Sequence, residues 1–265
     1  MDIKSLLQQT VIASIKGGEE ILKVYETSFD VEHKSDNSPL TIADKNAHAV
    51  ICKYLAENQL PILSEEGKNI DYSERKNWDY FWMVDPLDGT KEFIKRNGEF
   101  TVNIALIHNQ RPILGVIYIP VTKVLYFAAE GIGSFKIQVT EATPIADIDA
   151  LIKSAQKLPV KNNNRKFTVV ASRSHLSEET QMFIDGLKTQ HPDLEFISSG
   201  SSIKLCLVAE GSADVYPRFA PTMEWDTAAG QAICEIAGKS VIDYTTNGSL
   251  LYNKANLLNN WFTVN

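Results

Sequence analysis

Three apolar segments of strand length follow one another in the middle of the chain, and they restrict the folds open to it. They span residues 101–107, 113–118 and 124–128, and each is rich in β-branched or aromatic side chains. The residues between them, from Asn109 to Pro112 and around Pro120, are of types that form turns. The pattern predicts a meander of strands, so the first half of the chain must be built around a sheet.

Helix-like and strand-like segments lie on both sides of this meander. Residues 3–27 and about 41–58 carry apolar side chains at helical spacing, with Gly17-Gly18 as an expected point of strain in the first helix. After the polar stretch 154–166, strand patterns alternate with helix patterns over about 177–190, 202–210 and 226–237, and the strands are expected at 167–171, near 196, at 213–216 and near 241. We therefore predict an α+β lobe over residues 1–155 and an α/β lobe over residues 156–265.

The overall charge limits the partners of the protein. The 265 residues include 33 acidic and 26 basic side chains, for a net charge of −7. Proteins whose main task is to bind polynucleotides need a basic face, so we expect no polynucleotide partner. The charge leaves small anionic ligands open, because bound metal ions can supply positive charge.

The sequence also favours a cytoplasmic location. It has no signal-peptide pattern and no apolar run of about 18 residues that would span a membrane. Cys52, Cys206 and Cys234 form no C-x-x-C pair, which is typical of free thiols in a reducing compartment. Peripheral attachment to the cytoplasmic face of the inner membrane is compatible with the pattern, as is either a monomer or a homodimer.

Acidic residues stand where three predicted strands or helices begin or end. Glu65 follows the strand-like residues 61–64, Asp85 follows the apolar residues 80–84, and Asp226 precedes a helical pattern. Pro86 is expected to stop the second strand, and a turn then lets Asp85 and Asp88 face one point. Carboxylate and carbonyl oxygens are the ligands that Mg²⁺ prefers. Taken singly, each motif also fits a plainer reading, namely a surface charge, a capped turn or a helix cap.

Taken together and in order, the motifs are specific. P-I-L-S-E-E-G, W-M-V-D-P-L-D-G-T-K-E-F and E-W-D-T-A-A-G resemble the inositol monophosphatase-like superfamily of Mg²⁺-dependent, lithium-sensitive phosphatases. The resemblance implies the layered α/β sandwich of the inositol monophosphatase/fructose-1,6-bisphosphatase type, with the active site between two lobes and two or three Mg²⁺ ions. It also implies the metal ligands, which are Glu65, Asp85, the Leu87 carbonyl, Asp88 and Asp226.

A metal cluster of this kind allows a water molecule to attack a phosphate monoester without a protein nucleophile. The sequence has neither a G-x-S-x-G elbow nor a C-x₅-R loop, which agrees with that chemistry. The resemblance implies that Thr90 orients the attacking water and that Glu65 helps as base. It also implies that Asp36, in a loop, helps to recruit a weaker metal. Plainer readings are a capping hydroxyl for Thr90 and a solvated loop acid for Asp36.

The second lobe carries the substrate-discriminating segments. Residues 170–175 and 199–218 resemble those of the CysQ-type 3′(2′),5′-bisphosphate nucleotidases, which remove the 3′-phosphate of adenosine 3′,5′-bisphosphate in sulfur assimilation. Arg218 is the natural candidate for the 5′-phosphate, because a guanidinium binds phosphate through two hydrogen bonds. Lys204 is a supporting charge, and His175 is a candidate for contact with the ribose or base. The complete set of candidate substrate-binding residues is Leu87, Asp88, Gly89, Thr90, Lys91, His175, Ser201, Lys204, Arg218 and Asp226.

Two alternatives to the nucleotidase stay open at this point. One is a sugar phosphatase that resembles inositol monophosphatase. The other belongs to a different class, a non-catalytic sensor that binds metal or nucleotide. The plainer readings of Arg218, Lys204 and His175 are a surface cation, a helix-face lysine and a turn histidine.

Overall fold

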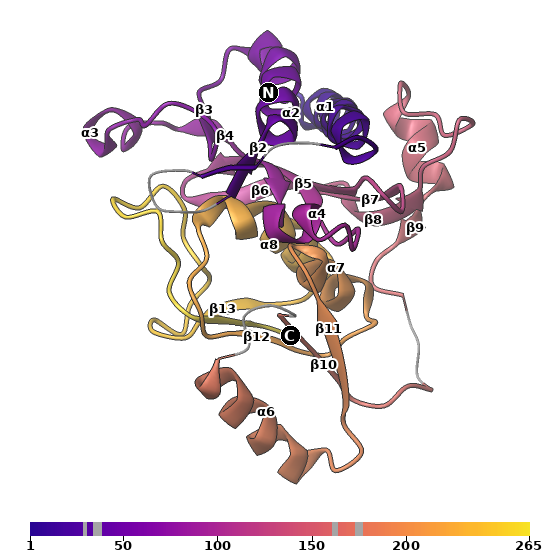
Figure 1. The fold of residues 1–265 in the computed structure, drawn as a ribbon, viewed down its shortest axis with the longest axis vertical. Coiled ribbons are helices and arrows are strands. Elements are labelled where there is room, and N and C mark those ends of the chain that lie inside the picture. Colours follow the sequence, from indigo (N-terminus) through magenta and orange to yellow (C-terminus); the bar gives the residue numbers. More distant parts are fainter. Residues whose placement is uncertain (29–30, 34–38, 161–163, 173–176) are drawn as a thin grey trace.

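A sheet of seven strands in the order β3-β4-β5-β6-β7-β8-β9 organises the fold in the computed structural model, which describes residues 1–28, 31–33, 39–160, 164–172 and 177–265 (Figure 1). β3 pairs parallel to β4, and every other neighbouring pair in this sheet is antiparallel. The predicted meander is confirmed as β5, β6 and β7. The strands are β3 (Ile62–Ser64), β4 (Tyr80–Asp88), β5 (Thr101–His108), β6 (Arg111–Ile119), β7 (Val124–Ala129), β8 (Gly133–Gln138) and β9 (Gln156–Lys157).

Helices cover both faces of this sheet. α1 (Ile3–Tyr25) and α2 (Ile42–Leu55) pack on one face, and α7 (Ile203–Glu210) and α8 (Glu224–Ile236) lie on the other (Figure 1). The alternation of side chains along β4 explains this, because Trp82 and Val84 join the core under α1 and α2, whereas Phe81 and Met83 join the core under α7 and α8. The arrangement confirms the predicted layered α/β architecture.

Two glycines allow the closest helix contacts on the first face. We predicted strain at Gly17 and Gly18, but α1 runs through them as one continuous helix. A Cβ atom on Gly17 would lie 2.8 Å from Ile51 Cδ1, and one on Gly18 would lie 2.6 Å from the ring of Tyr118. The glycines therefore permit α2 and β6 to approach α1, and the prediction of strain was wrong.

Two small sheets form the rest of the C-terminal half. β10 (Thr168–Ser172) pairs parallel to β11 (Glu195–Ser199), and α6 (Glu178–Gln190) lies between them in the chain. In the other sheet β14 (Phe262–Val264) pairs antiparallel with β12 (Tyr216–Arg218) and β13 (Val241–Asp243). The strand predicted at 213–216 therefore begins later, and Val215 makes only an isolated bridge to Val169.

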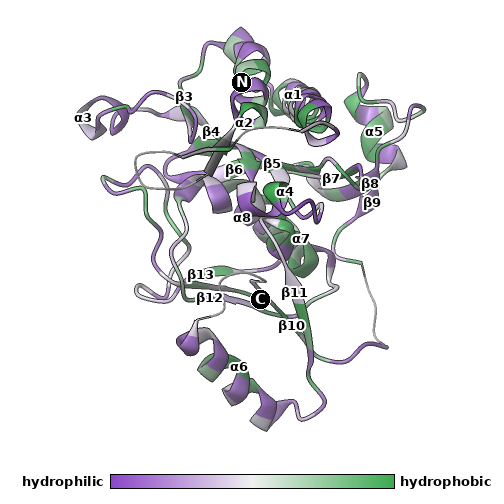
Figure 2. Ribbon diagram, in the orientation of Figure 1, coloured by the Kyte–Doolittle hydropathy of each residue, from purple (hydrophilic) through white to green (hydrophobic). Residues whose placement is uncertain are grey.

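The remaining elements are short, and α6 is amphipathic. Figure 2 shows hydrophobic and hydrophilic bands alternating along α6, whose Ile184 packs on β10 while most of the helix is exposed.

No helix within the described part of the chain is both long and apolar enough to cross a membrane. The division into lobes at residue 155 stays a prediction. The short elements are β1 (Val31–His33), β2 (Pro39–Thr41), η1 (Ala56–Asn58), α3 (Tyr72–Arg75), α4 (Thr90–Ile94) and α5 (Ile148–Ser154).

Candidate active site

The structure brings the three acidic motifs to one point. Glu65, Asp85 and Asp226 each offer a carboxylate oxygen, and these oxygens all lie within 4.8 Å of one another. Glu65 directly follows β3, and its backbone N–H donates to the Val84 carbonyl at 3.1 Å, which holds it beside Asp85 on β4. Asp226 comes from the first turn of α8, which packs on the face of the sheet opposite α1 and α2. Three segments far apart in the sequence therefore supply one acidic cluster.

The cluster brings like charges together, with Asp85 buried and Glu65 and Asp226 partly buried. Asp85 is 1% exposed, and burial, followed by the charges of Glu65 and Asp88, raises its pKa well above the ordinary value. Burial, followed by the charges of Asp88 and Glu65, also raises the pKa of Asp226. Buried carboxylates that repel one another are stabilised by a cation between them. The donor set, which contains only oxygen atoms, fits a hard divalent cation.

β4 does not end where the sequence predicted. The strand continues through Pro86 to Asp88, with a shift of register between Asp85 and Asp88. Proline lacks an N–H group and is tolerated where ladder bonds are interrupted, so it bends this strand without stopping it. The N–H of Leu87 donates to Asp85 Oδ1 at 3.0 Å. The turn follows at Gly89, which has a φ of +95° that only glycine adopts easily.

Thr90 has a partner that the sequence analysis missed. Its hydroxyl lies 3.3 Å from Asp44 Oδ1 and 3.4 Å from the Leu87 carbonyl. Asp44 is buried, and its Oδ2 accepts from the N–H of Thr41 at 2.8 Å and from the Thr41 hydroxyl at 2.7 Å, which caps α2. The T-x-x-D capping pattern at the start of α2 was visible in the sequence, but its contact with α4 was not.

Asp226 is the third residue of its helix and caps the helix from that position. We predicted a helix from residue 226, but α8 starts at Glu224 and its N-cap is Met223. The N–H of Met223 donates to Asp226 Oδ2 at 2.8 Å. Glu224 is fully buried and accepts from the N–H of Asn253 at 2.5 Å, from the N–H of Lys254 at 3.0 Å and from its Nζ at 2.6 Å. These bonds tie the start of α8 to the C-terminal loop.

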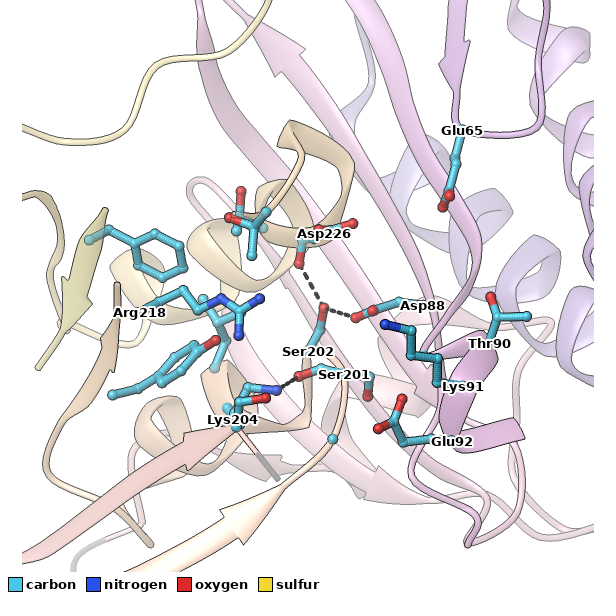
Figure 3. Close-up of a pocket in the computed structure, with 18 residues that line it drawn as sticks. Glu65, Asp88, Thr90, Lys91, Glu92, Ser201, Ser202, Lys204, Arg218 and Asp226 are labelled. Carbon is cyan, nitrogen blue, oxygen red and sulfur yellow. Dashed lines mark hydrogen bonds between the residues drawn. The ribbon is translucent and has the colours of Figure 1, made fainter. Parts of the chain in front are cut away.

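A cavity of about 210 Å³ adjoins the cluster. Figure 3 shows Arg218 and Lys204 on one side, Thr90 and Lys91 on the other, and Asp88 between them. Lys204 is 5% exposed, donates to the Ser201 carbonyl and lies 5.5 Å from the centroid of the Tyr216 ring. Burial lowers the pKa of Lys204 to about 8, although the charge of Asp88 acts in the opposite direction.

Two other groups in the cavity wall have unsatisfied polar atoms. Arg218 donates from Nη2 to the Pro221 carbonyl at 2.8 Å, but its buried Nε has no hydrogen-bond partner among the described residues. The buried hydroxyl of Ser201 also lacks one in this part of the chain, and its backbone φ is +41°. Unpaired buried donors beside a cavity are suited to binding a ligand. The predicted Asp36 and His175 lie outside the described residues.

The model of the Inositol monophosphatase family matches residues 2–263. The chain is 44% identical over 257 residues to the 3′(2′),5′-bisphosphate nucleotidase CysQ of Salmonella typhimurium, which covers 93% of this chain and 96% of that protein. The CysQ nucleotidase of Escherichia coli strain K12 matches with the same identity and coverage.

Solved structures agree with this result. The crystal structure of CysQ from Bacteroides thetaiotaomicron, a bacterial member of the inositol monophosphatase family, is similar with a TM-score of 0.91 at 52% identity, over 99% of this chain and 97% of that one. The fold of an inositol monophosphatase from Anabaena (Nostoc) is also similar, with a TM-score of 0.70 at 23% identity, over 100% of this chain and 91% of that one. The chain therefore belongs to the inositol monophosphatase family, as its three acidic motifs predicted.

Proposed function

We propose that this protein is a Mg²⁺-dependent 3′(2′),5′-bisphosphate nucleotidase that hydrolyses the 3′-phosphate of adenosine 3′,5′-bisphosphate to give AMP and phosphate. The identity to the CysQ nucleotidases over nearly the whole chain supports the reaction. One wall of the cavity carries Lys204 and Arg218, and it lies opposite Thr90 and Lys91 of α4. This cationic wall is the observation that carries the choice of substrate. A substrate with a second phosphate can use both walls, whereas a monophosphate can use only one.

The acidic cluster provides the metal site in this proposal. Glu65, Asp85, Asp88, Asp226 and the Leu87 carbonyl would hold two or three Mg²⁺ ions, since all five donate oxygen and three of their carboxylates already meet. When bound, such ions neutralise the phosphate oxygens and act as Lewis acids.

Thr90 and Glu65 act on the attacking water. The Thr90 hydroxyl donates a hydrogen bond to Asp44 Oδ1, so its lone pairs are left to accept a hydrogen bond from the water and orient it. The water oxygen attacks phosphorus, its proton passes to the Glu65 carboxylate, and the bond from phosphorus to O3′ breaks. The O3′ atom then takes a proton from solvent. Asp36 remains a candidate for the recruitment of a weaker metal.

The substrate contacts divide between the two sides of the cavity. Lys91 and the N–H groups of Gly89 and Thr90 are assigned to the 3′-phosphate beside the metal ligands. Arg218 is assigned to the 5′-phosphate, because its guanidinium lines the cavity and its Nε–H has no partner among the residues that the structure describes. Lys204 supports the same phosphate by its charge, and Ser201 and His175 stay candidates for the ribose or base.

The setting of the reaction follows from its substrate, which arises in sulfur metabolism. Cys52, Cys206 and Cys234 are all free, with the last two buried, as the sequence predicted for a reducing compartment. A cytoplasmic location and a monomeric or homodimeric state remain predictions from the sequence.

A panel of phosphate esters tests the proposal. Phosphate release is measured with adenosine 3′,5′-bisphosphate, adenosine 3′-monophosphate, inositol 1-phosphate and fructose 1,6-bisphosphate, each with Mg²⁺, with EDTA and with added Li⁺. We expect the adenosine bisphosphate to be hydrolysed fastest, EDTA to abolish hydrolysis and Li⁺ to inhibit it. Equal or faster turnover of the inositol ester would identify a sugar phosphatase, and no Mg²⁺-dependent turnover of any ester would identify a sensor.

Variants separate the roles of the two sides of the cavity. Arg218→Met should raise KM for the bisphosphate at least tenfold and leave KM for adenosine 3′-monophosphate nearly unchanged, because only the first substrate carries a 5′-phosphate. Asp88→Asn should remove turnover of both substrates while the protein stays folded by circular dichroism. An equal rise in KM for both substrates in Arg218→Met would contradict the assignment of the 5′-phosphate.

A further inference from the structure

Ser202 joins two of the acidic residues in the site. It precedes α7 as the N-cap residue and is 2% exposed. Its hydroxyl oxygen lies 2.7 Å from Asp88 Oδ2 and 2.7 Å from the carbonyl oxygen of Asp226 (Figure 3). Serine at an N-cap usually bonds to the first turn of its own helix, but this side chain makes no such bond. Its hydroxyl points to the acidic residues instead.

Asn103 on β5 hydrogen-bonds to both Ser202 and Asp88. It is 1% exposed, and its Nδ2 donates to Ser202 Oγ at 2.8 Å and to Asp88 Oδ2 at 3.3 Å. The Thr101 hydroxyl donates to Asn103 Oδ1 at 2.9 Å. That bond fixes the orientation of the amide, since its oxygen faces Thr101 and its nitrogen must therefore face Asp88.

The donors converge on the Asp88 carboxylate. The Ser202 hydroxyl accepts from Asn103 and has one proton to give, which the carboxylate and the Asp226 carbonyl share. Asp88 Oδ2 thus accepts from both Ser202 and Asn103. The backbone N–H of Ser202 also bonds to this carboxylate. Burial has the larger effect and raises the pKa of Asp88, and these bonds act against it by lowering that pKa.

We propose that Ser202 and Asn103 are positioning residues for the metal site. They hold the Asp88 carboxylate in one orientation toward a divalent cation, and they fix Asp88 relative to Asp226 across the junction of β4, β5 and α8. The inference rests on the proposed function for the catalytic use of the metal. The positioning itself concerns metal binding and can be tested without substrate.

The test is Mn²⁺ binding to the full-length, substrate-free protein, followed by the electron paramagnetic resonance signal of free Mn²⁺. We expect Ser202→Ala and Asn103→Ser each to weaken Mn²⁺ binding about 10- to 100-fold, as groups that hydrogen-bond to metal ligands commonly do. Ser134→Ala is the matched control, because the buried Ser134 hydroxyl donates to the Ile233 carbonyl at 3.0 Å near the other end of α8. This control should bind Mn²⁺ within twofold of the wild type.

The same measurement can overturn the proposal. If Ser202→Ala is folded and its Mn²⁺ affinity lies within twofold of the wild type, Ser202 has only a structural role. If Ser202→Ala does not fold, Asn103→Ser decides, and an unchanged Mn²⁺ affinity there overturns the proposal equally. Loss of affinity in Ser134→Ala of the same size would mean that any buried serine bond to α8 matters. Failure to hydrolyse adenosine 3′,5′-bisphosphate would overturn the proposed function and leave this measurement intact.

Discussion

Lys204→Met should make the protein more stable at neutral pH and a poorer enzyme. Lys204 is 5% exposed, and burial lowers its pKa from 10.5 to about 8, with the nearby charge of Arg218 acting in the same direction and those of Asp88, Glu92 and Glu99 opposing it. Methionine has a similar length and no charge, so it fills the same space without the cost of keeping an ammonium group away from water.

The lowered pKa sets the size and the pH dependence of the effect. Between pH 8 and pH 10.5 the unfolded chain binds more protons at this position than the folded chain, so the wild type gains stability as the pH rises. A shift of this size corresponds to about 3 kcal/mol at pH 7 and to less than about 1 kcal/mol at pH 10. The lost bond to the Ser201 carbonyl reduces the gain, so we expect Lys204→Met to be more stable by about 2 kcal/mol at pH 7.

Urea unfolding of both proteins at pH 7 and pH 10, with EDTA present, measures the difference. The advantage of Lys204→Met should shrink to less than about 1 kcal/mol at the higher pH. KM for adenosine 3′,5′-bisphosphate should rise in the variant, since a positive charge beside the 5′-phosphate is lost. A variant that is less stable at pH 7, or an advantage that does not change with pH, would show that burial of the ammonium group is not what perturbs Lys204.

Three further changes test the packing and the site. Gly18→Ala should lower the unfolding free energy in urea by about 1–3 kcal/mol, because the new Cβ meets the Tyr118 ring. Gly186→Ala in the exposed helix α6 should raise it by about 0.5–1 kcal/mol, because nothing lies near the new Cβ. Equal effects of the two substitutions would contradict the packing argument. Glu224→Gln should lower the unfolding free energy by about 2 kcal/mol, because the buried carboxylate accepts from the N–H groups of Asn253 and Lys254 and the glutamine NH₂ would face one of these donors; a change under about 0.5 kcal/mol would contradict that. Thr90→Val should lower kcat roughly 100-fold with little change in thermal stability, and an unchanged kcat would remove Thr90 from the proposed mechanism.

Part of the acidic site follows from local sequence, because Asp85 and Asp88 lie at the end of one strand. The meeting of Glu65 and Asp226 with Asp85 was implied only by the family resemblance, since these residues come from three separate segments. The continuation of β4 through Pro86 was missed, since a proline can either end a strand or sit at a break in its ladder. Only the pairing of β4 with β5 on both sides of the break decides between the two.

Residues that act through another element could not be predicted. Asp44 caps α2 by a pattern within its own helix, but its contact with Thr90 exists only because α2 and α4 meet at the sheet edge. Ser202 directly precedes a helical pattern, as an ordinary N-cap serine does, yet its hydroxyl hydrogen-bonds to Asp88, which lies 114 positions earlier in the chain. Such contacts depend on the tertiary fold, and local propensity carries no information about them.

The net charge of −7 argues against a polynucleotide partner but does not describe the site. Exposed charges more than about 8 Å apart are screened at physiological salt, so a ligand responds mainly to the buried groups around it. Two buried groups of opposite sign lie at the site, Asp85 in the acidic cluster and Lys204 in the cavity wall. Burial opposes the charged form of both, which raises the pKa of Asp85 and lowers that of Lys204. A divalent cation beside Asp85 and a phosphate beside Lys204 would each stabilise the charged form of its neighbour, so binding of the metal and binding of the substrate would both offset the cost of burial.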